Sequence, residues 1–259
     1  MRILATNDDG VYAEGLWASV NQLREVAEVI VVAPDREQSG VGTAITLNEP
    51  IRAMEIRPIV EGVKTYAVEG TPADSAILAL ESLLEKKVDL VVSGINRGAN
   101  LGNDMLISGT MGAAFQGFFR GIPAFALSVA ALKDVHYDTA ALVGKMLAQA
   151  VERGDLTSPL LLNVNVPNQP MDKIKGISIT QIGRRTYMDV VKEDDDGRRK
   201  YYWITRDKPG WVMEKGLDIW AVRRKRISIT PLHSDLINSI KNKSVNKVVR
   251  GVRDAVLGR

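Results

Sequence analysis

Two adjacent carboxylates follow the first apolar run of the chain. Asp8 and Asp9 lie directly after residues 1–6 (MRILAT), inside an Asn-Asp-Asp-Gly segment. Neighbouring acids repel each other unless a cation or a proton lies between them. A hard divalent ion such as Mg²⁺ or Mn²⁺ prefers oxygen ligands, so the pair indicates a metal site. All four residue types also favour turns, and the segment alone fits a plain turn equally well.

Two further loops are rich in polar side chains and glycine. Residues 35–42 (DREQSGVG) follow the apolar run 28–33, and residues 93–104 (SGINRGANLGND) follow the run 88–92. In an open parallel sheet, the loops after the strands lie along one edge, where ligands bind. We therefore expect the polar residues of these loops to converge with the early acids.

A possible anion site begins at Ser108-Gly109-Thr110, where a helix is expected over residues 108–119. Helix N-termini offer unpaired N–H donors and a favourable dipole to phosphate. The alternative is ordinary capping by Ser108, with the glycines needed only for close packing. We favour phosphate binding because this helix start lies beside the acidic edge. A cation next to an anion cradle fits a phosphoryl group.

The order of the expected elements predicts an α/β fold with a mostly parallel sheet. Expected strands at 1–6, 28–33, 88–92, 122–129 and 160–166 alternate with helices at 12–26, 72–84, 108–119 and 137–152. Residues 43–56 and 64–68 are expected to be extended, as a small antiparallel excursion. These elements place a core domain at residues 1–175.

The pattern changes after residue 175. Residues 176–259 are expected to form a β-rich extension, with strands around 177–180, 200–205, 219–222 and 226–230 and a hairpin tip at 193–197. Apolar residues at helical spacing predict a terminal amphipathic helix over 236–257. Such a helix is suited to docking on another subunit, although it could also dock on its own domain.

Composition excludes several classes of protein. The chain has 259 residues, 45% of them hydrophobic, which is enough for a large core. It has no cysteine, so disulfides, thiolate metal sites and cysteine nucleophiles are ruled out, and two histidines, His136 and His233, are too few for a zinc cluster. P-loop, dinucleotide-binding and G-x-S-x-G motifs are all missing from the sequence.

The charge is unevenly distributed along the chain. Residues 183–259 carry 19 Lys and Arg against 10 Asp and Glu, whereas residues 1–182 carry 15 against 21. A basic segment can bind nucleic acid, but we favour a solvated surface or a rim for anionic substrates. We therefore expect no nucleic-acid partner. No signal-peptide pattern or membrane-length apolar run occurs, so we expect a cytoplasmic protein without a membrane partner.

Several ordered blocks resemble the SurE survival-protein family of metal-dependent nucleotidases. The matching blocks cover nearly the whole chain, at residues 7–10, 33–40, 70–74, 93–100, 108–114, 163–167 and 227–232. Two positions depart from the family pattern: Ile107 stands where a tyrosine is common, and Ser75 where a cysteine is frequent. The first departure argues against stacking of a nucleobase at residue 107.

The resemblance implies a Rossmann-like, three-layer core and a phosphomonoesterase activity. Family members hydrolyse nucleoside 5′- and 3′-monophosphates and also short polyphosphate, with one divalent ion per subunit, Mg²⁺ or Mn²⁺. They form homodimers or homotetramers that exchange C-terminal elements. Carried over to this chain, the metal ligands are Asp8, Asp9, Ser39 and Asn96, and the phosphate contacts are Asn100, Ser108, Gly109 and Thr110.

The expected reaction is hydrolysis of the phosphoester by water, with Asp8 and Asp9 as the catalytic pair and Asp8 favoured as the base. One rival is a phosphatase in which an aspartate attacks phosphorus, but such enzymes commonly separate their two acids by one residue. A second rival is a stress protein that binds metal or nucleic acid without catalysis.

Overall fold

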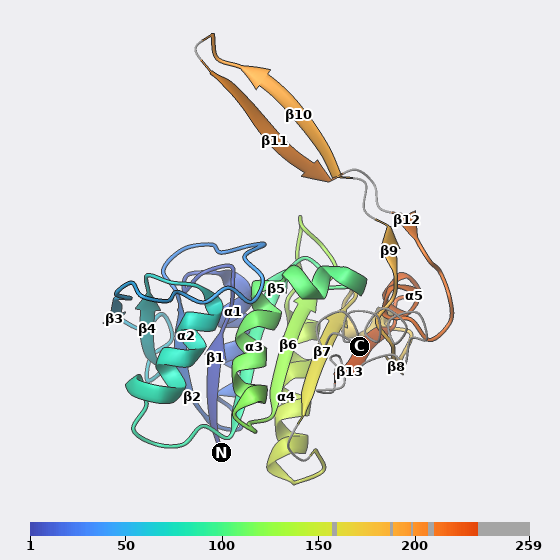
Figure 1. Ribbon diagram of the computed structural model, residues 1–259. Coiled ribbons are helices and arrows are strands. Elements are labelled where there is room, and N and C mark those ends of the chain that lie inside the picture. The colour runs from blue at the N-terminus through green and yellow to red at the C-terminus, as the bar shows by residue number, and fades with distance from the viewer. Residues whose placement is uncertain (157–159, 187–188, 198, 207–209, 233–259) are drawn as a thin grey trace, which may run out of the picture.

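A nine-stranded mixed sheet organises the molecule, which is shown as a computed structural model in Figure 1. The structure describes residues 1–156, 160–186, 189–197, 199–206 and 210–232. The strands run in the order β3-β4-β2-β1-β5-β6-β7-β13-β8. Their bounds are β1 Arg2–Thr6, β2 Glu28–Pro34, β3 Ala53–Glu55, β4 Lys64–Val68, β5 Leu90–Arg97, β6 Ala124–Val129, β7 Leu161–Val166, β8 Ile177–Ile179 and β13 Ile227–Leu232.

The six central strands, from β4 to β7, are all parallel. Strands β1 and β5 are neighbours, yet the chain continues from β1 toward β2 on one side and from β5 toward β6 on the other. Such a reversal leaves a crevice beyond the carboxyl ends of the two strands, which is where α/β proteins bind ligands. The order of the strands confirms the predicted α/β fold and locates its binding edge.

Helices cover both faces of the sheet and complete three layers (Figure 1). Helices α1 (Glu14–Leu23) and α4 (Asp138–Glu152) pack on one face, and α2 (Pro72–Leu78) and α3 (Gly109–Phe119) on the other. Alternate strand residues face opposite helices, so Ile3 joins the first core and Leu4 the second. None of the described helices combines the length and the apolar character needed to cross a membrane.

The chain beyond residue 175 adds two strands to the sheet and forms a separate hairpin outside it. Strand β13 pairs antiparallel with β7 and parallel with β8 at the edge of the sheet. Between β8 and β13, the antiparallel hairpin of β10 (Asp189–Asp195) and β11 (Lys200–Arg206) projects away from the body (Figure 1). The remaining elements are β9 (Arg185–Thr186), β12 (Gly210–Trp211) and α5 (Asp218–Arg223).

Three expected elements differ in the structure. The predicted strand at 219–222 is wrong: these residues belong to α5, since a four-residue apolar run is too short to show a period. Only Ala53–Glu55 is a strand within 43–56, where Asn48 adopts a positive φ of 64°. The helix expected at 72–84 ends as an α-helix at Leu78 and continues as a π-helical turn over Ala79–Leu83. The predicted helix at 236–257 lies outside the described residues.

Asp218 ties the start of α5 to two other loops. One carboxylate oxygen accepts hydrogen bonds from the backbone N–H of Gly183 (2.9 Å) and Ile219 (2.7 Å), and the other accepts from Gly102 (2.8 Å). Burial raises the pKa of Asp218, while the three N–H donors oppose that shift. Gly102 opens the 3₁₀ turn Gly102–Ile107, which leads directly into α3. The carboxylate therefore fixes the approach to the N-terminus of α3.

We expect Asp218→Asn to lower the free energy of unfolding by about 1–3 kcal/mol, measured by urea denaturation. An amide presents an oxygen on only one side, so its NH₂ group would face a buried N–H donor that is left without an acceptor. Asp138→Asn is the matched control, because Asp138 also lies in the first turn of a helix but is exposed. Equal stability of the Asp218→Asn and Asp138→Asn variants would contradict this role.

Candidate active site

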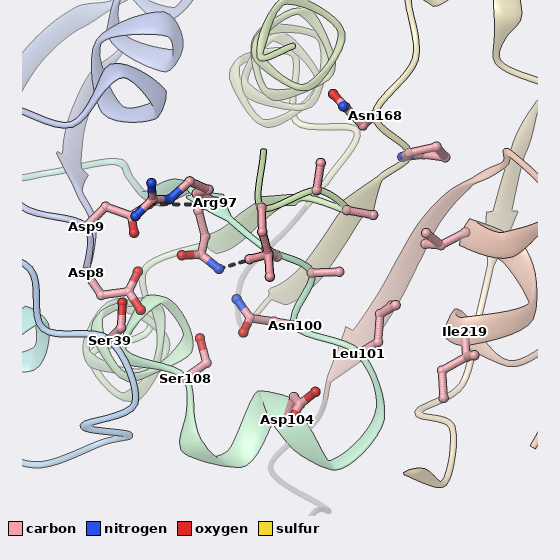
Figure 2. A pocket seen from close by; sticks show the side chains of 18 of the residues that line it. Asp8, Asp9, Ser39, Arg97, Asn100, Leu101, Asp104, Ser108, Asn168 and Ile219 are labelled. Atoms are coloured by element: carbon pink, nitrogen blue, oxygen red, sulfur yellow. Dashed lines mark hydrogen bonds between the residues drawn. The ribbon is translucent and has the colours of Figure 1, made fainter. Parts of the chain in front are cut away.

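A cavity of about 1230 Å³ lies at the crevice between β1 and β5. Its lining comes from the segments after β1, β2, β5, β6 and β7, from the start of α3, and from α5 and its C-terminal side. Figure 2 shows Asp8, Asp9, Ser39, Asn100 and Ser108 around one end of it. Six of the predicted site residues line this cavity: Asp8, Asp9, Ser39, Asn96, Asn100 and Ser108.

Backbone hydrogen bonds hold the first two loops against each other. The Gln38 N–H donates to the Asp8 carbonyl oxygen at 2.7 Å. Gly10 has a φ of +96°, and the Asn7 side chain donates to its carbonyl at 2.9 Å, so the segment is indeed a turn. The turn also delivers both acids to the cavity, and the docked second loop brings Ser39 to them.

Asp8 is almost fully buried at the N-terminus of α3. The hydroxyl of Thr110 donates to its Oδ1 at 2.6 Å. Burial raises the pKa of Asp8 to about 6; the charge of Asp9 raises it further, and the hydrogen bonds from Thr110 oppose the shift. Gly109 permits this close approach, because a Cβ at that position would lie 2.8 Å from the Cβ of Asp8.

Asp9 is held by the strand on the other side of the crevice. Its Oδ2 accepts the backbone N–H of Arg97 at 3.0 Å (Figure 2). Burial raises the pKa of Asp9, and the Arg97 backbone donor and guanidinium charge oppose the shift. The guanidinium also lies 3.9 Å from the carboxylate of Glu37. Sequence reasoning did not single out Arg97 or Glu37, although both lie in the polar loops that it identified.

Ser39 and Asn96 are oriented to present oxygen to the cavity. The Ser39 hydroxyl donates to Glu37 Oε1 at 2.8 Å, which leaves the lone pairs of its oxygen available. The Asn96 amide nitrogen donates to the Gly98 carbonyl at 2.7 Å, so the carbonyl oxygen of the side chain remains as an acceptor. Asn96 lies where the pairing of β5 with β6 shifts register.

This set of donors fits a hard divalent ion. Two carboxylates, one hydroxyl and one amide oxygen are the ligands that Mg²⁺ and Mn²⁺ prefer. In the part of the chain that the structure describes, no three His, Cys, Asp or Glu side chains form a group that could hold an ion. The hydroxyl and the amide oxygen are therefore needed to complete the set.

The start of α3 combines capping with access to the cavity. The Ser108 hydroxyl accepts the Met111 N–H at 3.2 Å, as an N-cap does, and Ser108 also lines the cavity. The two interpretations of the sequence are therefore compatible. Gly109 and Thr110 lie behind Asp8 and outside the lining, and Thr110 is fully buried.

Asn100 connects the cavity to a set of buried polar side chains. Its Nδ2 donates to the Ser128 hydroxyl at 3.0 Å and lies 3.5 Å from the Thr110 hydroxyl. Asn163 and Asn165 of β7 bind its backbone. Sequence reasoning gave Ser128, Asn163 and Asn165 no role. The sequence did offer a signal, since two asparagines occupy alternate positions of an otherwise apolar strand. Buried amides need hydrogen-bond partners, so these two side chains had to bind polar groups nearby.

The other end of the cavity has a different chemical character. Figure 2 places Ile219 and Asn168 away from the acid pair. Leu132 and Val222 add apolar surface to the lining of the cavity, and Gln169 adds a second amide. Ile107, which is partly exposed, lines the cavity near Ser108. This end has room and polar groups for an organic moiety attached to a phosphate.

Comparison with known proteins identifies the family. The family described as "Survival protein SurE" matches residues 3–189. A protein named 5′-nucleotidase SurE from Dehalococcoides mccartyi (strain CBDB1) is 46% identical over 238 residues, covering 91% of this chain and 90% of its own. Another of that name, from Pelobacter propionicus, is 44% identical over 247 residues, covering 95% and 98%.

A solved structure agrees with these matches. The crystal structure of the SurE protein from Aquifex aeolicus superposes with a TM-score of 0.79 at 37% identity, covering 98% of this chain and all of that one. The resemblance found in the sequence blocks is thereby confirmed, and the chain belongs to the SurE survival-protein family.

Proposed function

We propose that this protein hydrolyses nucleoside 5′-monophosphates, and also 3′-monophosphates and short polyphosphate, with one bound divalent ion, Mg²⁺ or Mn²⁺, per subunit. The names of its relatives support the nucleotidase activity. The observation that carries the proposal is the cavity at the strand reversal, where two carboxylates face a helix N-terminus. Oxygen ligands for a cation lie there beside donors for an anion.

The proposed roles divide the residues into two groups. Asp8, Asp9, Ser39 and Asn96 hold the ion, which when bound polarises a phosphoryl oxygen and lowers the pKa of water. Asn100 and Ser108, which line the cavity, contact the phosphoryl oxygens, while Gly109 and Thr110 contribute the N-terminal dipole of α3 from behind Asp8.

Asp8 orients the attacking water and accepts its proton, with Asp9 beside it. The Thr110 hydroxyl occupies one oxygen of Asp8 at 2.6 Å and thereby fixes the carboxylate plane. The remaining lone pairs of the carboxylate serve the ion and the water. Because only the water attacks phosphorus, no covalent phosphoenzyme forms.

The apolar end of the cavity receives the nucleoside. Leu132, Ile219 and Val222 offer contact surface to the base and sugar, and Asn168 and Gln169 offer donors and acceptors. Since α5 contributes two of these apolar residues, the segment after residue 175 takes part in substrate binding.

Residues 176–259 further serve, in this proposal, to form a homodimer or homotetramer. The projecting hairpin supports it, because Val191, Tyr202, Trp203 and Ile204 are between 58% and 80% exposed. Apolar surface of this kind marks interaction sites. We place the enzyme in the cytoplasm, where its proposed nucleotide substrates occur, and assign it no membrane or nucleic-acid partner.

Removal of the metal or of one ligand is expected to abolish turnover. Wild-type protein dialysed against EDTA should release no phosphate from AMP, and Mn²⁺ should restore the activity. In Asp9→Ala, kcat should fall by at least about 100-fold, because even the outer hydrogen-bond partners of metal ligands contribute about 10–100-fold. Phosphate release measures the loss of turnover, and calorimetric titration with Mn²⁺ measures the loss of metal binding in Asp9→Ala.

Asp138→Ala is the control, since Asp138 is an exposed carboxylate outside this cavity. It should retain full activity, and both variants should give the circular dichroism spectrum of the wild type. Full activity of Asp9→Ala would refute the ligand assignment.

Acid quenching distinguishes direct attack by water from attack by an aspartate. Enzyme mixed with ³²P-labelled nucleotide and quenched during turnover should carry no covalent label, because water is the nucleophile. A labelled protein that loses its label in Asp8→Ala would instead establish the aspartyl-phosphate rival. Absence of any phosphate release with Mg²⁺, Mn²⁺ or other divalent ions would favour the binding protein without catalysis.

The role of the hairpin can be tested by light scattering coupled to size exclusion. The wild type should be at least dimeric, and Trp203→Ser with Ile204→Ser should lower the oligomeric state because the apolar contact is lost. Lys192→Ser on the paired strand, opposite Trp203, is the control and should leave the mass unchanged. A monomeric wild type would contradict the proposal.

A further inference from the structure

Two asparagines are buried in the middle of the molecule, on strand β7. Asn163 and Asn165 are 0% exposed and alternate with Leu162, Val164 and Val166. Burying an amide without hydrogen bonds costs about 1–3 kcal/mol in proteins. Both side chains must therefore have partners, and nearly all of these partners are backbone atoms of one residue, Asn100.

Asn165 binds the backbone of Asn100 at two points. Its Oδ1 accepts the Asn100 N–H at 2.8 Å, and its Nδ2 donates to the Asn100 carbonyl oxygen at 3.2 Å. The Nδ2 of Asn163 donates to the same carbonyl at 2.8 Å. Asn165 Nδ2 also lies 3.2 Å from Asn163 Oδ1, so the two side chains orient each other.

Asn100 belongs to no helix or strand, so no regular ladder satisfies its backbone. The side-chain amides of β7 replace such a ladder and satisfy both its N–H and its C=O. Because both groups are fixed, the direction of the Asn100 Cα–Cβ bond is fixed, and contacts of the side chain itself set its rotamer. Its Nδ2 meets Ser128 on β6 at 3.0 Å and the Thr110 hydroxyl on α3 at 3.5 Å.

The connection continues to the acid pair. Thr110 donates to Asp8 at 2.6 Å, so hydrogen-bonded side chains extend from β7 through Asn100 and α3 to the end of β1. Asn163 and Asn165 do not line the cavity. They cannot touch a substrate there, and any effect on the reaction must pass through Asn100.

We propose that Asn165, assisted by Asn163, is a positioning residue for the reaction, holding Asn100 so that its side chain lines the cavity while its Nδ2 meets Thr110, the residue that binds Asp8. This inference rests on the proposed function. Displacement of a reacting group by about 1 Å can cost roughly 100-fold in rate, so a fixed backbone at Asn100 has a direct kinetic consequence.

The test compares steady-state hydrolysis of AMP in Asn165→Ala, Asn163→Ala and Ser228→Ala with the wild type, at saturating Mn²⁺. Asn165→Ala should lower kcat roughly 10–100-fold and change KM by less than about threefold. Asn163→Ala should have a smaller effect, because Asn165 still donates to the Asn100 carbonyl. Ser228 is the matched control: it is equally buried, pairs with Asn165 on the next strand, and bonds Thr180 instead of Asn100.

A double-mutant cycle separates positioning from general stability. In an Asn100→Ala background there is no side chain left to position, so Asn165→Ala should then lower kcat by less than about threefold. A residue that only supports the fold would lower kcat by the same factor in both backgrounds. Equal factors, or a loss in Ser228→Ala as large as in Asn165→Ala, would overturn the inference.

Asn163→Ala supplies the same cycle if Asn165→Ala fails to fold, because it removes one donor to Asn100 and one acceptor for Asn165 but leaves the two-point contact of Asn165 with Asn100 intact. An equal kcat for Asn163→Ala and the wild type would then overturn the assistance of Asn163. Failure of the proposed function gives a different result, since the wild type itself would then release no phosphate from AMP with Mn²⁺.

Discussion

Two carboxyl groups stand next to each other at the end of β1, inside a partly buried crevice, and their mutual repulsion has to be offset by their surroundings. Asp8 receives the Thr110 hydroxyl and lies against the N-terminus of α3, while Asp9 receives the Arg97 N–H from the neighbouring strand. One contact comes from α3 and the other from β5, and both elements meet β1 where the strand order reverses. This arrangement of the pair depends on β1 and β5 being neighbours and on α3 beginning at the same edge. Burial still raises both pKa values, so a cation or a proton between the two groups would stabilise the pair.

A second constraint follows from the first. Thr110 can face Asp8 only if the helix start is held in place, and two features far apart in the chain do this. Asp218 fixes Gly102 at the approach to α3, and the asparagines of β7 fix Asn100 beside it. Both anchors are buried polar side chains that bind backbone atoms. The segment between β5 and α3 is thus anchored at Asn100 and at Gly102, where its 3₁₀ turn begins.

The sequence predicted much of the core and the place of the site because both follow from strong local patterns. Alternation of apolar strands with amphipathic helices indicated the parallel sheet, and polar loops after those strands indicated one shared edge. The α5 segment was assigned wrongly, since its four apolar residues carry no period. The set of hydrogen bonds around Asn100 could not be anticipated, because it depends on side chains that are distant in the sequence and adjacent only once β6 and β7 are paired.

The position of β13 has a consequence for how the protein is made. Strand β7 ends at Val166, but the partner that covers its outer edge, β13, begins only at Ile227, after the hairpin. A chain emerging from the ribosome would hold every residue of the acid pair and of the asparagine contact while one border of its sheet still lacks a neighbour. Open borders of this kind invite pairing with other chains. Chaperone protection during synthesis would matter most in the interval between the emergence of these two strands.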